Sequence, residues 1–246
     1  TLYARCIPEL VTISLDKDGG GGMISTIYQH YQDAYYANYD EESKALDLKI
    51  SAVDVPIKEG YVFQGYYYNL GEDDEAQMTD AQGNILDTIA AKAFATSPVT
   101  WTAKWAPAST KISFDANFEG TSYASVAPIE VDFGAKLPAS TAVTGIGQRS
   151  GYSIVGFGYK GVQYFSLSLD AGGATGTLAP INPDTPWNIN EPAITMEIIW
   201  ASSSYNVKFD GNSSFGTAVT KGAAPENIEG IAMDQSVYMP SKNTLT

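Results

Sequence analysis

The stretch Gly60-Tyr-Val-Phe-Gln-Gly-Tyr66 occurs a second time, in altered form, as Gly151-Tyr-Ser-Ile-Val-Gly-Phe157. Aromatic and β-branched residues favour strands, so both stretches predict strands, over Tyr61–Tyr68 and Tyr152–Tyr159. The first glycine of each copy can end a turn at positive φ. The second removes a side chain where a neighbouring strand or ring can approach closely. The element therefore indicates β-structure and not a reactive site.

Two further patterns repeat in register with this one. Asp80-Ala-Gln-Gly83 follows Gly60 by 20 residues, and Asp170-Ala-Gly-Gly173 follows Gly151 by 19. In the other pattern, a second anchor lies nine positions after the first, and an Asp follows the second anchor directly. Its three copies are Cys6, Leu15 and Asp16; Trp105, Phe114 and Asp115; and Trp200, Phe209 and Asp210. Self-similarity at periods of 99 and 95 residues is the signature of tandem modules.

The repeats divide the chain into four parts. Residues 1–9 are expected to be the closing strand of a preceding repeat plus a linker, and residues 10–108 a complete repeat with a Tyr-rich insertion. Residues 109–203 are a second complete repeat, and residues 204–246 the front part of a truncated one. We expect that last part to be poorly packed or to pair with a neighbour, and the natural protein to continue after Thr246 with another copy of the Gly-Tyr element.

The expected fold class is mixed β (α+β), dominated by strands, with at most one short helix in each module. Short stretches that alternate around apolar residues predict the remaining strands: Val11–Leu15, Val99–Trp105, Lys111–Phe114, Ile194–Trp200 and Asn206–Phe209. Asp40–Leu48 and the Ala-rich Asp87–Ala95 are the two candidates for short helices. Linkers of a few residues should string neighbouring modules closely together.

The order of these motifs resembles the Listeria–Bacteroides repeat, also called the internalin B-type repeat, of bacterial surface proteins. The resemblance rests on Gly60–Tyr66, Asp80–Gly83, Trp101-Thr-Ala-Lys-Trp105 and Val207-Lys-Phe-Asp210. It implies tandem β-grasp-like (ubiquitin-like) modules with a spacer or adhesive role, outside the cell on its surface or wall. It implies no catalytic residues.

The sequence departs from the family pattern in three places. Cys6 stands where the later copies have Trp105 and Trp200, and Phe157 replaces a Trp or Tyr. The repeats are also longer than the family unit, and the first carries an insertion over about residues 28–48. A specialised function would be expected in such an insertion.

Composition narrows the expected partners. Asp and Glu number 28 against 14 Lys and Arg, which gives a net charge of −14. Such a field repels nucleic-acid backbones and anionic membrane surfaces. No stretch approaches the roughly 18 apolar residues that span a bilayer. The expected partners are a protein or glycan on a host or neighbouring cell and the adjacent repeats of the same chain, with no nucleic acid and no membrane insertion.

Aromatic residues are the candidate ligand-binding residues, since exposed Tyr and Trp suit glycan stacking and protein interfaces. Tyr66, Tyr67 and Tyr68 are consecutive, so at least one ring in a strand should face away from the core. The other candidates are Tyr35 and Tyr36 in the insertion and Trp187 in a loop. The competing interpretation is that these rings pack against one another. A carbohydrate-binding region of an exported glycosidase is the alternative function.

Catalysis and cofactors are not expected. The single Cys and single His, Cys6 and His30, could form a dyad, but Cys6 occupies a core-anchor position. A zinc site would have too few Cys and His ligands. The acidic loop Gly71–Glu75, with Asp80 and Asp87, could bind Ca²⁺, although it does not match the EF-hand pattern and is expected to be a solvated loop. Nothing singles out a glycosidase pair among the carboxylates.

Overall fold

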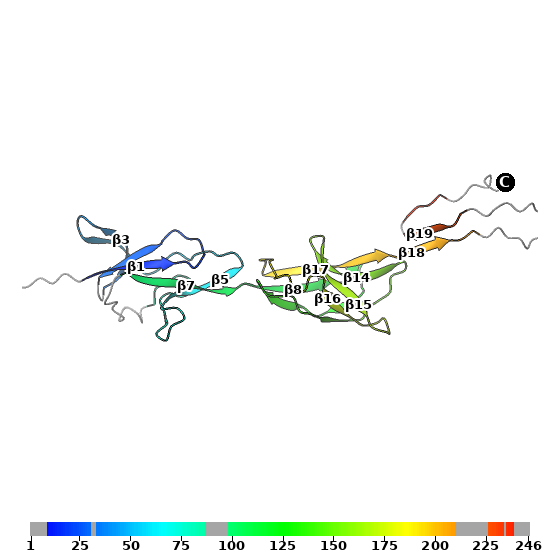
Figure 1. Ribbon diagram of the computed structural model, residues 1–246, viewed down its shortest axis with the longest axis horizontal. Coiled ribbons are helices and arrows are strands. Elements are labelled where there is room, and N and C mark those ends of the chain that lie inside the picture. The colour runs from blue at the N-terminus through cyan, green and yellow to red at the C-terminus, as the bar shows by residue number, and fades with distance from the viewer. Residues whose placement is uncertain (1–8, 31–32, 87–97, 210–225, 234, 239–246) are drawn as a thin grey trace, which may run out of the picture. The chain divides into compact units, whose positions relative to one another are not determined.

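The computed structural model describes residues 9–30, 33–86, 98–209, 226–233 and 235–238 (Figure 1). Within these ranges the chain forms strands and turns, and no helix that could span a membrane is found there. The chain divides into two compact units. Unit 1 comprises Thr1–Thr110, Asp132–Ala135 and Trp187–Pro192, and unit 2 comprises Lys111–Val131, Lys136–Pro186 and Ala193–Thr246.

Unit 1 is built on a seven-stranded sheet with the order β4-β3-β2-β1-β7-β5-β6. Its strands are β1 Leu10–Asp16, β2 Thr26–His30, β3 Tyr35–Asp40, β4 Ala45–Ile50, β5 Tyr61–Tyr68, β6 Ala76–Gln77 and β7 Val99–Pro107. The first and last strands, β1 and β7, are parallel neighbours, with Ile13 opposite Val99 and Asp16 opposite Thr102 (Figure 1). The other neighbouring strands of this sheet are antiparallel.

The core of unit 1 lies on one face of this sheet. Alternate residues of β1 are buried, as the period of a half-buried strand requires: Val11, Ile13 and Leu15. They belong to the same cluster as Trp101 of β7, which is fully buried. Fully burying an aliphatic side chain such as Val11, Ile13 or Leu15 stabilises a fold by about 1.5–3 kcal/mol. The buried residues on this face therefore contribute much of the stability of the unit.

Unit 2 contains most of an eight-stranded sheet with the order β11-β13-β16-β15-β14-β17-β8-β12. Its strands are β8 Ser109–Asp115, β11 Ser125–Val126, β12 Ile129–Asp132, β13 Thr141–Thr144, β14 Tyr152–Tyr159, β15 Val162–Leu169, β16 Gly176–Pro180 and β17 Ala193–Ser202. A small ribbon, β9 Asn117–Phe118 with β10 Thr121–Ser122, follows β8. Again the first and last strands, β8 and β17, are parallel, with Ile112 opposite Ile194.

The two sheets share a five-strand skeleton. The order β2-β1-β7-β5-β6 in one corresponds to β12-β8-β17-β14-β15 in the other, with the parallel pair at its centre. In each skeleton the strand after the repeated glycine, β5 or β14, pairs antiparallel with the last strand and carries one extra residue there.

Both units also close in the same way. The carbonyl of Gly60 accepts a hydrogen bond from Ala108, and that of Gly151 accepts one from Ser203. Both glycines have φ of +76° and lie under a large apolar side chain. A Cβ on Gly60 would come within 2.3 Å of the Phe133 ring, and one on Gly151 within 2.4 Å of Met233 Cγ. The positive φ and these close side chains both favour glycine at the two turns.

The last described strands, β18 Ser204–Val207 and β19 Ile228–Ala232, form a separate antiparallel ribbon (Figure 1). Residues 204–246 thus include a strand pair, and Met233, which is 47% exposed, lies against Gly151. The linkers are shorter than expected, because a single residue separates β7 from β8 and β17 from β18.

The helix predicted over Asp40–Leu48 is wrong. Strand β3 runs to Asp40, a turn follows, and β4 begins at Ala45. The Asp40 carboxylate accepts hydrogen bonds from the backbone N–H groups of Glu42 and Ser43, and these bonds lower its pKa. A short acidic side chain that binds the backbone in this way stabilises a turn in competition with a helix. The other candidate helix, Asp87–Ala95, and the strand expected over Thr1–Cys6 lie outside the described residues.

Candidate functional site

Tyr66, the first of the three consecutive tyrosines, is a core residue. Phe63 pairs with Trp105 and Gly65 with Lys104, so Gln64 is an extra residue in β5. This bulge turns Tyr66 onto the face of Phe63, where the two rings meet edge to face at 5.1 Å. Tyr66 is fully buried, whereas Tyr67 and Tyr68 are partly exposed.

Two more of the predicted binding residues are packed. Trp187 is 3% exposed, and its indole Nε1 donates a hydrogen bond of 3.1 Å to Thr110 Oγ1. Tyr35 is 5% exposed and packs edge to face against Trp101 at 5.5 Å. The packing interpretation therefore holds for Tyr35, Tyr66 and Trp187. A binding role for Tyr36, Tyr67 and Tyr68 stays a prediction.

The acidic loop uses its carboxylates within the protein. Asn69 Nδ2 donates to both carboxylate oxygens of Asp74 at 2.9 Å, and the Gly71 N–H donates to Glu75. The Glu75–Lys104 ion pair, at 2.9 Å, lowers the pKa of Glu75 and raises that of Lys104. In the part of the chain that the structure describes, no three His, Cys, Asp or Glu side chains gather as a metal site.

The structure does not test the candidate Cys–His dyad, because Cys6 lies outside the described residues. Asp87 of the candidate calcium set lies outside them as well. His30 is the last residue of β2, and its Nδ1 is buried. Among the residues that the structure describes, the acidic side chains of the candidate calcium loop do not gather as a metal site.

The structure instead shows a cation among aromatic rings beside the repeated glycine of each unit. In unit 1, Lys58 Nζ lies 5.0 Å from the ring centre of Tyr61 and 5.6 Å from that of Trp105. At such distances the electron-rich face of an aromatic ring attracts a cation. We call these three residues the unit 1 cage.

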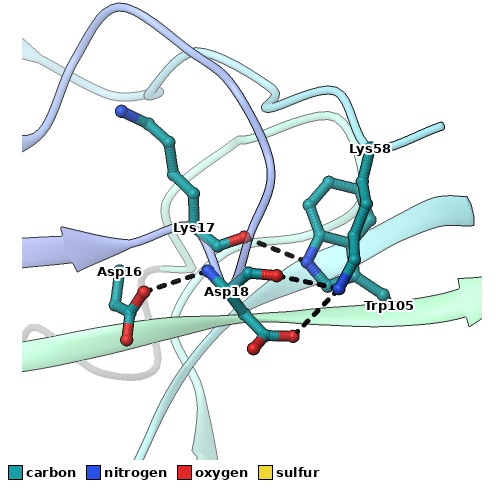
Figure 2. A network of polar contacts seen from close by, with 5 residues as sticks. All are labelled: Asp16, Lys17, Asp18, Lys58 and Trp105. Carbon is teal, nitrogen blue, oxygen red and sulfur yellow. Dashed lines mark hydrogen bonds and ion pairs between the residues drawn. The ribbon is translucent and has the colours of Figure 1, made fainter.

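Lys58 and Trp105 of the unit 1 cage have polar partners within the protein (Figure 2). Lys58 Nζ donates to the carbonyl of Asp18 at 2.8 Å and forms an ion pair of 3.3 Å with its carboxylate. Trp105 Nε1 donates to the carbonyl of Lys17 at 3.1 Å. The loop that follows β1 lies close to Trp105: a Cβ on Gly20 would be 2.6 Å from the Trp105 indole ring. This cage is closed.

The unit 2 cage has the same parts. Arg149 precedes Gly151 by two residues, as Lys58 precedes Gly60. Its Cζ lies 3.8 Å from the ring centre of Tyr152 and 5.1 Å from that of Trp200. A third ring, Phe118, lies 3.6 Å away. The guanidinium is thus in van der Waals contact with two rings, an arrangement that a planar Arg forms well.

The unit 2 cage lacks the partners that close the first. Asn117 stands where unit 1 has Asp18, since each follows the repeated Asp by two residues, and its side-chain amide donates to Asp115 at 2.6 Å. Trp200 Nε1 is buried without a hydrogen-bond partner in the described chain. No ion pair of Arg149 is found among those residues either.

A cavity of about 650 Å³ opens at the unit 2 cage. Arg149, Tyr152 and Trp200 line it together with polar groups from Gln148, Ser150, Ser153 and Ser203. Its volume falls within the ~300–1,000 Å³ of typical small-molecule sites. The sequence carried a signal for this site, a cation two residues before each repeated glycine, but the Trp positions were interpreted only as core anchors.

Comparisons with protein-family models, with curated proteins and with solved structures found no match to the chain. The resemblance to the Listeria–Bacteroides repeat therefore stays a prediction.

Proposed function

We propose that the chain is a non-catalytic spacer region of a bacterial cell-surface protein, built from tandem β-grasp-like modules that can also act as weak, multivalent adhesins. One observation carries this proposal: the first and last strands of each unit lie side by side and parallel. The chain therefore enters such a strand pair at one end and leaves it at the other, so each module added to a tandem array adds length.

The strand order supports the β-grasp assignment. A β-grasp sheet has its first and last strands as parallel neighbours at its centre. The orders β2-β1-β7-β5-β6 and β12-β8-β17-β14-β15 have this arrangement. The one-residue connections at Ala108 and Ser203 fit a chain in which a closing strand passes directly into the next opening strand.

Parallel terminal strands also suit a tether under load. A force applied to the two ends of a module pulls β1 and β7 along their own axes in opposite directions. The hydrogen bonds between them, over four paired positions in unit 1 and five between β8 and β17, then bear the force together and not one after another. A module of this kind would resist extension while it holds a distal domain away from the cell.

Surface display tests the spacer role. An epitope carried on one, two or four copies of residues 10–203 should become more accessible to a bulky antibody as the number of copies rises. The variant Tyr67→Ala, at a partly exposed ring, is the matched control and should leave accessibility unchanged. Accessibility that does not depend on copy number would contradict the spacer role.

A carbohydrate-binding region of an exported glycosidase is the second candidate. It is supported by Tyr67, a predicted binding residue with part of its ring at the surface and the Lys104 ammonium 4.6 Å from the ring centre. Saturable binding on a glycan array that disappears in Tyr67→Ala would favour it. Trp187→Ala cannot test binding, because Trp187 is buried and its loss would disturb folding.

A further inference from the structure

We propose that the unit 2 cavity beside Arg149 binds a carboxylate-bearing sugar, such as a hexuronic acid residue of an acidic polysaccharide. This proposal is independent of the spacer role, since a module could extend the chain with or without a ligand in this cavity.

The unit 1 cage indicates which group the unit 2 cage lacks. In unit 1 the caged cation pairs with the Asp18 carboxylate at 3.3 Å. Unit 2 has Arg149 in place of Lys58, with Tyr152 and Trp200 as the corresponding rings, but the neutral Asn117 replaces that Asp. A carboxylate from a ligand would therefore complete in unit 2 the interaction that unit 1 makes internally.

Arg149 is suited to hold such a group. Its guanidinium is flanked by the rings of Phe118 and Tyr152 at 3.6 and 3.8 Å. Ring contacts occupy the faces of a planar guanidinium, and its N–H donors point outward in the plane. Those donors match a carboxylate in a two-point, charge-assisted hydrogen bond. With a net charge of −14 the chain as a whole repels anions, so selectivity for a carboxylate must come from Arg149.

The remaining lining points to a sugar. Tyr152 and Trp200 contribute aromatic surface, on which the apolar face of a pyranose ring can stack. Three serine hydroxyls and one carboxamide, from Ser150, Ser153, Ser203 and Gln148, are arranged around them. Small groups that both donate and accept hydrogen bonds match a ring bearing several hydroxyls.

The test uses the full 246-residue chain, titrated with the trisaccharide of galacturonic acid and followed by the indole N–H signals in NMR spectra. The Trp200 signal, assigned as the one missing in Trp200→Phe, should shift with saturation. The neutral galactose trisaccharide should bind at least about tenfold more weakly, which corresponds to the loss of one charge-assisted contact.

Three unit 2 variants should reduce binding, each for its own reason. Arg149→Gln removes the cation, and Trp200→Phe reduces the aromatic surface of the cavity. Asn117→Asp restores the unit 1 carboxylate and should occupy Arg149 from within. Because Asn117 is exposed, this last change keeps the test valid even if Arg149→Gln disturbs folding. Lys58→Gln and Trp105→Phe, the matched changes in unit 1, should leave affinity unchanged.

Several results would overturn the proposal. One is the absence of any shift at about 10 mM trisaccharide, where a Kd near 1 mM would give ~90% saturation. Equal affinity for the acidic and the neutral trisaccharide would also overturn it, as would equal affinity for the acidic trisaccharide and for a peptide carboxylate without sugar hydroxyls. So would unchanged binding in Asn117→Asp, or a loss of binding in the unit 1 variants.

Discussion

Gly65 and Gly156 lie where β5 and β14 come close to a neighbouring backbone. A Cβ on Gly65 would be 2.2 Å from the carbonyl oxygen of Thr79, and one on Gly156 would be 1.8 Å from that of Phe165. Gly65 also has φ of +124°, a conformation that other residues rarely adopt. The second glycine of the repeated motif is therefore required by close backbone approach, as the sequence predicted.

Replacing either glycine should destabilise its unit. Gly156→Ala forces Cβ into a backbone carbonyl, and overpacking of this kind costs about 1–3 kcal/mol or more. Gly172→Ala is the matched control, because a Cβ there meets nothing within 4 Å. Chemical denaturation of the two variants compares their free energies of unfolding. Equal stabilities would contradict the close approach at Gly156.

Tyr66→Phe should be neutral or stabilising by up to about 1 kcal/mol. The Tyr66 hydroxyl is buried without a hydrogen-bond partner in the described chain, and removing such a group relieves an unpaid desolvation penalty. The corresponding residue of unit 2 is already Phe157, which is fully buried. Loss of more than about 1 kcal/mol in thermal unfolding would mean that the hydroxyl has a partner.

The same residue predicts a pH dependence. Burial, followed by the charges of Asp54 and Asp16, raises the pKa of Tyr66 above its usual value near 10. Below that value the phenol is neutral in both the folded and the unfolded states. Above it the unfolded chain loses the proton first, so stability should fall as the pH rises beyond about 10. Tyr66→Phe should reduce this alkaline loss; an unchanged pH profile would contradict it.

Among the elements, the bulges of β5 and β14 are stabilised in the same way. Gln77 Nε2 donates to the carbonyls of Gln64 and Thr79 at 3.2 and 2.9 Å. Gln163 Nε2 donates to those of Val155 and Phe165 at 3.3 and 3.0 Å. In each strand the first of these carbonyls belongs to the extra residue, so one amide holds the bulge to its neighbouring strand.

Gln163→Glu tests this arrangement with little change in shape. A carboxylate cannot donate, so both carbonyls lose their partner, and we expect a loss of about 1–3 kcal/mol at neutral pH. The loss should shrink when acid protonates the new carboxyl group. Gln148→Glu, at an exposed position, is the control. Equal effects of the two changes in urea denaturation would argue against a role for Gln163 in the bulge.

The strands were easier to predict than the faces they present. Tyr61–Tyr68 and Tyr152–Tyr159 form strands with the expected bounds. The bulge could not be predicted, because the extra residue is defined by the register of the partner strand. It decides that Tyr66 and not Tyr67 is buried. Asp40–Leu48 was a candidate helix, but the Asp40 side chain stabilises a turn there.

Across the whole molecule, the repeated motifs appear in both units at corresponding strands, and the parallel pairing of first and last strands recurs. The cages were missed because they join residues far apart in the chain, 40 positions for Lys58 and Asp18 and 88 for Trp105 and Lys17. Contacts at such separation depend on how the strands are ordered in the sheet, which local patterns do not reveal.

The most direct test of the load-bearing claim is single-molecule force spectroscopy. Pulled by its two ends, the chain should give two unfolding events, each releasing roughly 30 nm, the length of about 95 extended residues. A second geometry attaches the force to cysteines introduced at positions 150 and 203 of unit 2. That force peels β14 from β17 at one end of their antiparallel pair. The account predicts a clearly higher unfolding force in the end-to-end geometry. Equal forces in the two geometries, or a lower force end to end, would contradict it.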